Sequence, residues 1–185
     1  MTIFKKKKLE RDTFRKLRDE ISHKQREKVA KNVRLYINSF VKGFKNLGYI
    51  AIYWPLKNEV DIRSLKKQFT LALPRCKDKK ELLFYPWDEK PLTKDSEGIL
   101  SPNNSYSLSH DQINLILVPC LSVDKSLIRL GYGGGYFDKL RRDNDWRNVP
   151  CIGVLSSNCV STIPLTKAEW DIPLSGYITE KEIFV

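Results

Sequence analysis

Short apolar runs between helical segments constrain the fold of this chain more than any other feature. Residues 49–54 and 114–118 consist almost entirely of aliphatic, β-branched and aromatic side chains, which is typical of strands buried on both faces. Further strand signals lie near Leu71 and at residues 82–85, 151–155 and 177–179. Because strands and helices alternate, we expect an α/β fold, a three-layer sandwich with a mostly parallel central sheet of the Rossmann-like kind.

A pair of helices is expected before the first strand. Residues 5–20 and 23–42 contain few helix breakers and carry apolar side chains at helical spacing. Ser22 stands three residues before Gln25, and this capping-box pattern satisfies free amides where the second helix begins.

Length and composition favour one folded domain over residues 1–185. A chain of 185 residues can bury a substantial core, and its 41% hydrophobic and 30% charged residues give an ordinary globular balance. Residues 61–69 predict one more helix, and residues 88–109, rich in Pro, Ser and Asn, predict a loop. We find no internal repeat and no linker that would divide the sequence.

The net charge makes nucleic acid an alternative partner. Of the formal net charge of +11, residues 1–47 carry +10, with 15 Lys and Arg against 5 Asp and Glu. Cations of this kind drive binding to nucleic acid, so one hypothesis treats the N-terminal helix pair as an RNA- or DNA-contacting module on an inert α/β domain. The remaining residues are nearly neutral, and we therefore do not expect nucleic acid as the main partner.

The sequence carries no signal for a membrane or for export. Its longest apolar stretch, residues 115–121, is interrupted by a proline and is far shorter than the roughly 20 residues of a membrane span. The N-terminus runs directly into four lysines without an apolar signal-peptide core. We expect a cytoplasmic monomer whose four scattered cysteines are reduced packing residues. These cysteines are Cys76, Cys120, Cys151 and Cys159.

The segment with the clearest chemistry is residues 129–138, Arg-Leu-Gly-Tyr-Gly-Gly-Gly-Tyr-Phe-Asp, which follows the apolar run 114–118. Glycines let backbone N–H groups approach an oxyanion, and a following helix adds its partial positive charge. Arg129 has the geometry to clamp a phosphate, and Asp138 is the kind of oxygen ligand that Mg²⁺ prefers. The segment therefore indicates a phosphate site at the carboxyl end of a strand.

A Gly-rich turn that only connects a strand to a helix is the alternative for residues 131–135. Two other nucleotide motifs fit less well, because no Gly-Lys-Ser/Thr follows the glycines and their spacing is not Gly-x-Gly-x-x-Gly. A P-loop and a dinucleotide fold are therefore disfavoured.

Residues 129–138 resemble the signature of the 5-formyltetrahydrofolate cyclo-ligase family, also called 5,10-methenyltetrahydrofolate synthetases. Residues 118–124, Val-Pro-Cys-Leu-Ser-Val-Asp, are similar to the family's Val-Pro-Gly-Leu-Ala-Phe-Asp, and residues 58–61, Asn-Glu-Val-Asp, match its early motif. Residues 170–174, Trp-Asp-Ile-Pro-Leu, resemble its C-terminal His-Asp-x-Pro-Leu, and residues 7–11 resemble its basic opening. The resemblance covers nearly the whole chain.

The resemblance implies a role for each matching residue. Arg129 and Lys7 are implied as catalytic, and Asp138 and Asp171 as Mg²⁺ ligands. The implied ATP contacts are Lys7, Lys8, Arg11, Arg129, Leu130, Gly131, Tyr132, Gly133, Gly134, Gly135, Tyr136 and Phe137. The implied substrate contacts are Trp54, Glu59, Tyr132, Gly133, Gly134, Gly135 and Tyr136. Under a small register shift, Lys8 or Arg15 takes the place of Arg11.

The resemblance also implies a reaction, with ATP and Mg²⁺ as cofactors and 5-formyltetrahydrofolate, with or without a polyglutamate tail, as partner. The formyl oxygen attacks the γ-phosphate, N10 closes the ring, and phosphate leaves to give 5,10-methenyltetrahydrofolate. The protein mainly positions two anions and neutralises charge. An ATP-dependent enzyme acting on another anionic acceptor is a further alternative.

Three positions depart from the family pattern. Cys120 and Leu127 stand where glycine is common, and Ser101 replaces the glutamate of a Gly-Ile-x-Glu-Pro motif. The lost carboxylate affects the expected recognition of the pterin, whereas the nucleotide half of the motif is intact.

Several of these residues also have ordinary structural interpretations. Lys7 and Arg11 are compatible with solvated charges on a basic helix, and Trp54 with packing at a strand end. Glu59 is compatible with a helix cap, and Asp171 with a turn. We assign no role to the two histidines, His23 and His110.

Overall fold

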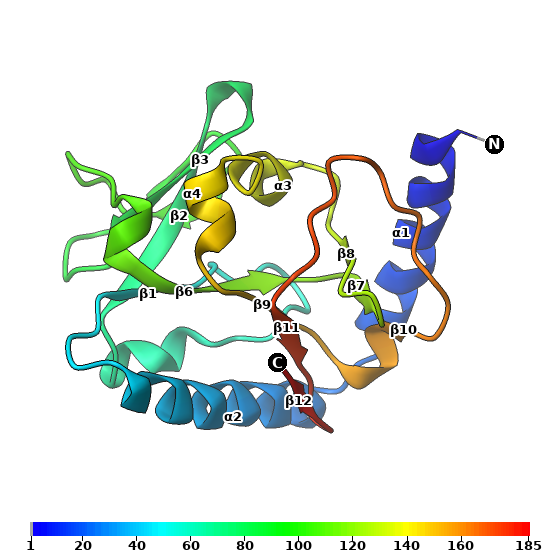
Figure 1. The fold of residues 1–185 in the computed structure, drawn as a ribbon, viewed down its shortest axis with the longest axis horizontal. Coiled ribbons are helices and arrows are strands. Elements are labelled where there is room, and N and C mark those ends of the chain that lie inside the picture. The colour runs from blue at the N-terminus through cyan, green and yellow to red at the C-terminus, as the bar shows by residue number, and fades with distance from the viewer. Residues whose placement is uncertain (1) are drawn as a thin grey trace.

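A computed structural model describes residues 2–185, and its centre is a seven-stranded sheet with strand order β12-β11-β9-β6-β1-β2-β3 (Figure 1). The five inner strands run parallel, while β3 and β12 are antiparallel strands at the two edges. The strands are β1 Tyr49–Ala51, β2 Leu71–Lys77, β3 Glu81–Pro86, β6 Ile113–Pro119, β9 Cys151–Val154, β11 Gly176–Ile178 and β12 Ile183–Phe184. The expected mostly parallel sheet is confirmed.

Helices cover both faces of this sheet. Helix α2 (His23–Phe40) crosses one face, and the short helices α3 (Tyr136–Leu140) and α4 (Asn144–Asn148) lie on the opposite face (Figure 1). Helix α1 (Ile3–Asp19) stands beside the sheet, next to the small sheet that contains β7 and β8. The N-terminal helix pair is therefore present, and Ser22 caps α2 by accepting a hydrogen bond from the Gln25 N–H.

The apolar runs supply a core on each side of the sheet. Successive residues of a strand point to opposite faces, so Leu115 and Leu117 of β6 pack with the cluster beneath α2, whereas Ile116 and Val118 belong to the cluster on the α3 side. A strand buried on both faces needs no polar alternation, which explains the uninterrupted apolar pattern of residues 115–118.

Smaller elements account for the segments between these layers. A three-stranded sheet is formed by β7 (Ser122–Asp124), β8 (Arg129–Leu130) and β10 (Val160–Ser161), and a hairpin by β4 (Thr93–Lys94) and β5 (Leu100–Ser101). The 3₁₀ turns are η1 Val41–Gly43, η2 Arg63–Lys67, η3 Asp78–Lys80, η4 His110–Gln112 and η5 Ser157–Cys159.

The expectation of a helix at residues 61–69 was wrong, and the segment contains the 3₁₀ helix η2 instead. Asp61 accepts hydrogen bonds from both the backbone and the guanidinium of Arg63, and such local bonding competes with an α-helical turn. The predicted loop at residues 88–109 contains the β4–β5 hairpin, whose two-residue strands are too short for sequence periodicity to reveal.

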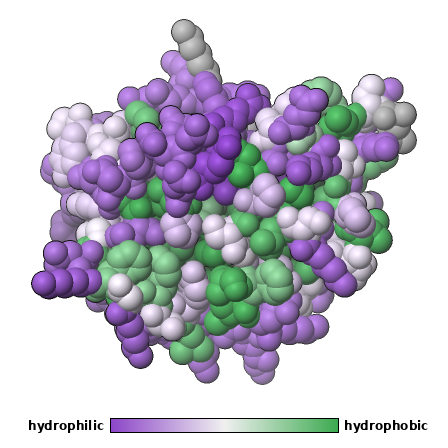
Figure 2. Space-filling model, in the orientation of Figure 1, coloured by the Kyte–Doolittle hydropathy of each residue, from purple (hydrophilic) through white to green (hydrophobic). Residues whose placement is uncertain are grey.

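The surface in Figure 2 is largely hydrophilic, with hydrophobic groups gathered in its middle band. Exposed apolar residues include Ile183 and Phe184 of the edge strand β12. Within residues 2–185, no helix is long and apolar enough to cross a membrane. The four cysteines are free thiols buried in the interior.

Asp124 holds the β7–β8 hairpin in place. Its carboxylate is 2% exposed and accepts hydrogen bonds from the N–H groups of Ser126, Ile128 and Leu165, at 2.9, 3.0 and 2.8 Å. These bonds fix the turn that leads to Arg129 and tie it to the chain near Leu165.

Replacing Asp124 is therefore expected to destabilise the fold. In Asp124→Ala, the buried N–H groups of Ile128 and Leu165 and the more exposed N–H of Ser126 lose their acceptor, which costs about 3 kcal/mol in the free energy of unfolding. The midpoint of thermal unfolding, followed by circular dichroism, should fall by roughly 6–12 °C. Lys125→Ala, at an exposed neighbouring position, serves as the control. An unchanged midpoint in Asp124→Ala would contradict this account.

Candidate functional site

A glycine loop, residues 131–135, connects β8 to α3. Gly133 and Gly135 have φ angles of 107° and 77°, in the left-handed region where only glycine is free of strain. At Gly131, an added Cβ would lie 3.1 Å from the Arg129 guanidinium. The glycines are therefore required by the backbone path and by the close approach of Arg129.

Helix α1 holds this loop through cations that are spaced four residues apart. The Arg11 Nε donates to the Gly131 carbonyl at 2.9 Å, and the Arg15 Nη2 donates to the Tyr132 carbonyl at 3.3 Å. One turn earlier, the buried Lys7 ammonium forms an ion pair with Asp171, which is also buried. The spacing of four places these cations on one helix face, and this face points toward the site.

Arg129 and Asp138 form an ion pair at the two ends of the loop. The Arg129 Nη2 is 2.7 Å from the Asp138 Oδ1, and its Nη1 donates to the Pro119 carbonyl at the end of β6. Burial disfavours the charged form of Asp138, but Arg129, Lys7 and Arg11 outweigh it, so the pKa of Asp138 lies below its ordinary value. The carboxylate is ionised at neutral pH.

Two cavities meet at the glycine loop. A cationic cavity of about 390 Å³ lies on the α1 side, and an apolar cavity of about 310 Å³ lies on the side of β1 and β2. Both are lined by the glycine loop together with Arg129 and Asp138. The apolar cavity includes Trp54 after β1 and Pro119 of β6, so it lies at the carboxyl ends of parallel strands, where α/β folds bind ligands.

The cationic cavity has the chemistry of a polyanion site. Its only carboxylate, among the residues described, is Asp138, and it also contains the aromatic residues Phe4 and Trp170. Its cations are Lys7, Arg11, Lys80, Arg129, Lys139 and Arg142. Such a concentration of positive charge beside bare backbone N–H groups suits a chain of phosphates.

The apolar cavity contains one buried acid, Glu59. Its Oε2 accepts a hydrogen bond from the Leu56 N–H at 2.7 Å, whereas its Oε1 has no hydrogen-bond partner in the described part of the chain. Burial raises the pKa of Glu59, which hydrogen bonds and the Arg18 charge lower only in part. A free, buried acceptor at a cavity wall is suited to a ligand that donates hydrogen bonds.

The predicted site residues fall into three groups. Lining the apolar cavity are Trp54, Glu59, Arg129, Gly131, Tyr132, Gly134, Gly135, Tyr136, Phe137 and Asp138. Lining the cationic cavity are Lys7, Arg11, Arg129, Gly131, Gly133, Gly135 and Asp138. Lys8, Leu130 and Asp171 line neither cavity.

Lys8 and Leu130 were predicted to contact the nucleotide, but neither side chain lines a cavity in the structure. Lys8 is exposed on α1 and the Leu130 side chain is 1% exposed in the core. Helix geometry explains the first, since α1 turns Lys7 and Arg11 inward and Lys8 away. Strand alternation explains the second, because Arg129 and Leu130 point to opposite sides of β8.

Sequence reasoning missed several charged residues at the cavity walls. Lys80 lies in the β2–β3 turn and Arg142 follows α3, and both reach the cationic cavity. Asp95 and Glu97 lie between β4 and β5 and line the apolar cavity. Only the folded topology brings these segments together, and no local pattern in the sequence marks them.

Glu97 supplies a carboxylate near the position where the family motif has a glutamate and this chain has Ser101. Ser101 is fully buried, and its hydroxyl donates to the Thr93 carbonyl within the hairpin. Glu97, four residues earlier, instead places a carboxylate at the apolar cavity, where it accepts a hydrogen bond from the Tyr136 hydroxyl. Glu97 therefore adds a carboxylate to the wall of this cavity, besides Glu59.

The two predicted metal ligands both lie beside Lys7. Asp171 is its ion-pair partner, and the charge of Lys7 also lowers the pKa of Asp138. Within residues 2–185, no group of three or more His, Cys, Asp or Glu side chains is arranged to hold a metal ion. Mg²⁺ commonly uses one or two carboxylates and completes its shell with water and substrate phosphates, so this donor set fits Mg²⁺ bound together with a nucleotide.

Comparisons with known proteins agree on one family. The profile of the 5-formyltetrahydrofolate cyclo-ligase family matches residues 3–180. A 5-formyltetrahydrofolate cyclo-ligase of Haemophilus influenzae is 25% identical over 175 residues, which cover 89% of this chain and 92% of that protein.

Two solved structures share the fold of this chain. An NMR structure of the Aquifex aeolicus 5,10-methenyltetrahydrofolate synthetase has a TM-score of 0.77 and 27% identity, with 96% of this chain and 91% of that chain covered. A 5,10-methenyltetrahydrofolate synthetase from Mycoplasma pneumoniae has the same fold, with a TM-score of 0.69 and 24% identity over 94% of this chain and 98% of that chain.

Because the pKa of Glu59 is raised, we expect its ionised carboxylate to lower the free energy of unfolding at neutral pH. A carboxyl whose pKa is higher in the folded than in the unfolded state stabilises the fold fully only below its unfolded pKa, and this contribution is lost as pH rises through the folded pKa. Glu59→Gln keeps an acceptor for Leu56 and removes the charge. Its unfolding midpoint should exceed that of the wild type at pH 7.5, and the difference should shrink as the pH approaches 4.5. A variant less stable at pH 7.5 would refute this.

Proposed function

Because the chain belongs to the 5-formyltetrahydrofolate cyclo-ligase family, we propose that it converts 5-formyltetrahydrofolate to 5,10-methenyltetrahydrofolate and uses ATP, with release of ADP and phosphate. The observation that carries the proposal is the pair of unlike cavities that share the glycine loop, Arg129 and Asp138. Two different ligands can therefore meet at one place. We further propose that residues 1–185 act as one domain, because both cavities draw on segments far apart in the chain.

The triphosphate of ATP would occupy the cationic cavity. Lys7, Arg11 and Arg129 face it, and they match the residues that the family resemblance implies for nucleotide contact. The loop N–H groups add donors that no side chain obstructs, since the positions are glycines. Phe4 and Trp170 lie 6.2 Å apart, centroid to centroid, and line the same cavity, so they offer an apolar surface for the nucleotide base.

The pterin of the folate would occupy the apolar cavity. Trp54 and Tyr136 line it with aromatic surface, and the free Oε1 of Glu59 offers an acceptor to the N–H groups of the ring. Glu97 supplies a second carboxylate at the wall formed by the β4–β5 hairpin. The protein can therefore recognise the pterin through Glu59 and Glu97, although it has no carboxylate at Ser101.

In the proposed reaction, the formyl oxygen on N5 attacks the γ-phosphorus of ATP and ADP departs. The N10 nitrogen then attacks the activated formyl carbon and loses its proton, and the C–O bond breaks as phosphate leaves. An amide-like oxygen leaves poorly by itself, so phosphorylation supplies the driving force. The contribution of the protein is to hold the two ligands in line and to neutralise charge, with Arg129 at their common boundary.

Asp138 and Asp171 would hold Mg²⁺, which neutralises phosphate charge when it is bound with ATP. In the ligand-free protein these carboxylates are paired with Arg129 and Lys7. The pairing holds the two cations and the two carboxylates in position at the proposed nucleotide site.

The geometry speaks against a nucleic-acid-binding helix pair as the main function. Lys7, Arg11 and Arg15 of α1 bond to residues of the proposed site, so part of the positive charge of this helix is engaged there. Failure to retain an oligonucleotide at low salt would remove this alternative, because charge-driven binding is strongest there.

A cyclisation assay tests the proposed function directly. Purified protein with MgATP and 5-formyltetrahydrofolate should develop the methenyl absorbance, with one ADP and one phosphate released per product. Omission of ATP, of Mg²⁺ or of the folate should abolish the signal. Turnover of ATP only with a different anionic acceptor would support the alternative enzyme instead.

Arg129→Ala and Asp138→Asn test the role of the two charged residues that line both cavities. Each variant should lower kcat by at least about 100-fold, since preorganised charge at a reacting phosphate is worth that much, and circular dichroism should report a folded protein. Lys125→Ala, exposed and away from both cavities, is the control. Near-normal rates in both site variants would refute the site assignment.

A further inference from the structure

The last turn of α1 lies against Glu59, the buried acid of the apolar cavity. Resting on the proposed function, we infer that Arg18 in this turn is a positioning residue for the folate, which acts through Glu59 and Tyr132 and holds Glu59 as the acceptor for the pterin. Arg18 lines neither of the two cavities at the glycine loop. It reaches a ligand only through Glu59 and Tyr132, both of which line the apolar cavity.

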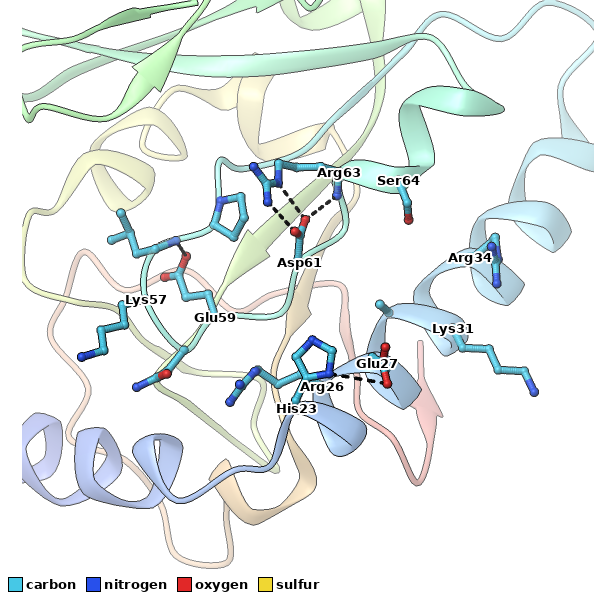
Figure 3. A pocket seen from close by; sticks show the side chains of 14 residues that line it. His23, Arg26, Glu27, Lys31, Arg34, Lys57, Glu59, Asp61, Arg63 and Ser64 are labelled. Carbon is cyan, nitrogen blue, oxygen red and sulfur yellow. Dashed lines mark hydrogen bonds and ion pairs between the residues drawn. The ribbon is translucent and has the colours of Figure 1, made fainter.

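The residue after Arg18 fixes the turn that carries Glu59. The Asp19 Oδ1 accepts a hydrogen bond from the Asn58 Nδ2 at 2.9 Å and lies 3.2 Å from the Arg18 Nη2. Asn58 has a φ angle of 66°, in the left-handed region that residues other than glycine adopt at a cost. The Glu59 Oε2 accepts from the Leu56 N–H, and Figure 3 shows the carboxylate folded back toward this turn. The end of α1 thus holds the backbone from which Glu59 extends.

A small cavity of about 20 Å³ brings Arg18, Glu59 and Tyr132 together beside α1. The Arg18 Nε, the Glu59 Oε1 and the Tyr132 hydroxyl are buried there, and none of these atoms completes a hydrogen bond within the described part of the chain. The Arg18 guanidinium carbon lies 5.4 Å from the ring centre of Tyr132. A cavity of this volume holds about one water molecule, so little solvent screens the charge of Arg18 from the carboxylate.

The charge of Arg18 acts directly on the carboxyl group of Glu59. Burial raises the pKa of Glu59, and the Leu56 N–H, Tyr132 and the charge of Arg18 lower it only in part. A buried carboxylate needs such support to stay ionised. Arg18 therefore favours the charged form of Glu59, which is the stronger acceptor for a hydrogen bond.

The other cations near Glu59 are engaged or directed elsewhere. Arg26 of α2 donates to the Ile21 carbonyl, Arg63 is paired with Asp61, and the Lys57 side chain points away from Glu59 in Figure 3. The remaining titratable groups that interact with Glu59 from other segments are Tyr53, Cys120 and Tyr132. None of these three carries a positive charge, which leaves Arg18 as the supporting cation.

The first test separates folate binding from nucleotide binding. In Arg18→Met, KM for 5-formyltetrahydrofolate should rise by about tenfold, because a hydrogen bond to a charged group is worth that much, whereas KM for ATP should change by less than about twofold. Arg18→Lys keeps a charge at this place and should restore most of the loss. Lys16→Met is the control, with the same change in net charge at an exposed position of the same turn. A rise shared by KM for ATP, or equal in Arg18→Met and Arg18→Lys, would overturn the inference.

The acidic limb of the pH profile of kcat/KM for the folate should also move. The inference needs an ionised Glu59, so activity falls as the pH drops through the pKa of this carboxyl, and removal of a nearby cation raises that pKa. In Arg18→Met the limb should therefore shift to higher pH, whereas in Arg18→Lys and Lys16→Met it should stay near that of the wild type. An unshifted limb in Arg18→Met would contradict the role of its charge.

A stability cycle tests the contact without any ligand and so separates this inference from the proposed function. Arg18→Met, Glu59→Gln and the double variant are unfolded by heat at pH 7.5 and followed by circular dichroism. Arg18→Met should lower the midpoint less in the Glu59→Gln background than in the wild type, because a neutral amide does not need the cation. Equal shifts in the two backgrounds would overturn the inference even if the protein cyclises the folate. Unequal shifts in a protein that does not cyclise it would support the contact and refute the proposed function alone.

Discussion

The contact between α1 and the glycine loop is the constraint on which the rest of the site depends. The Arg11 side chain binds the Gly131 carbonyl and Lys7 binds Asp171, so α1 is joined to two segments that lie more than 100 residues further along the chain. None of these segments forms an anion site alone. The basic N-terminal segment, which gives the chain its net charge, is therefore a structural part of the cationic cavity.

Internal ion pairs prepare this site for ligands. Arg129 is almost fully buried and Asp138 is its partner, and the equivalent pair on the α1 side is Lys7 with Asp171. An unpaired charge at such depth would be costly, so each cation needs a carboxylate partner. The same two carboxylates are the ones that we propose as ligands of Mg²⁺.

The sequence predicted the parts of the fold that arise from local patterns. Residues 114–118 indicated a doubly buried strand because burial on both faces removes polar alternation, and the Ser22 cap marked the start of α2 because capping is local chemistry. The helix expected at residues 61–69 failed because Asp61 bonds to Arg63 and holds a tighter turn. Lys8 was placed in the site by motif matching, whereas the rotation of α1 selects Lys7 and Arg11.

The residues that the sequence did not indicate come from connections that only the sheet order creates. Lys80 belongs to the turn between β2 and β3, and Glu97 to a hairpin of two-residue strands. Both reach the glycine loop because β2 and β3 lie at the sheet edge beside α3. The motif at residues 129–138 predicted the glycine loop that the two cavities share, whereas the other residues of their walls come together only in the tertiary structure.

The glycine loop between the apolar and the cationic cavity limits which substitutions the site can accept. A side chain introduced at Gly131 or Gly135, which border both cavities, would intrude on donor and acceptor together, so affinity for one ligand cannot be tuned there without disturbing the other. Adaptation to a new substrate is then expected at the outer walls, where Trp54 and Glu59 line only the apolar cavity and Lys80 and Arg142 line only the cationic cavity.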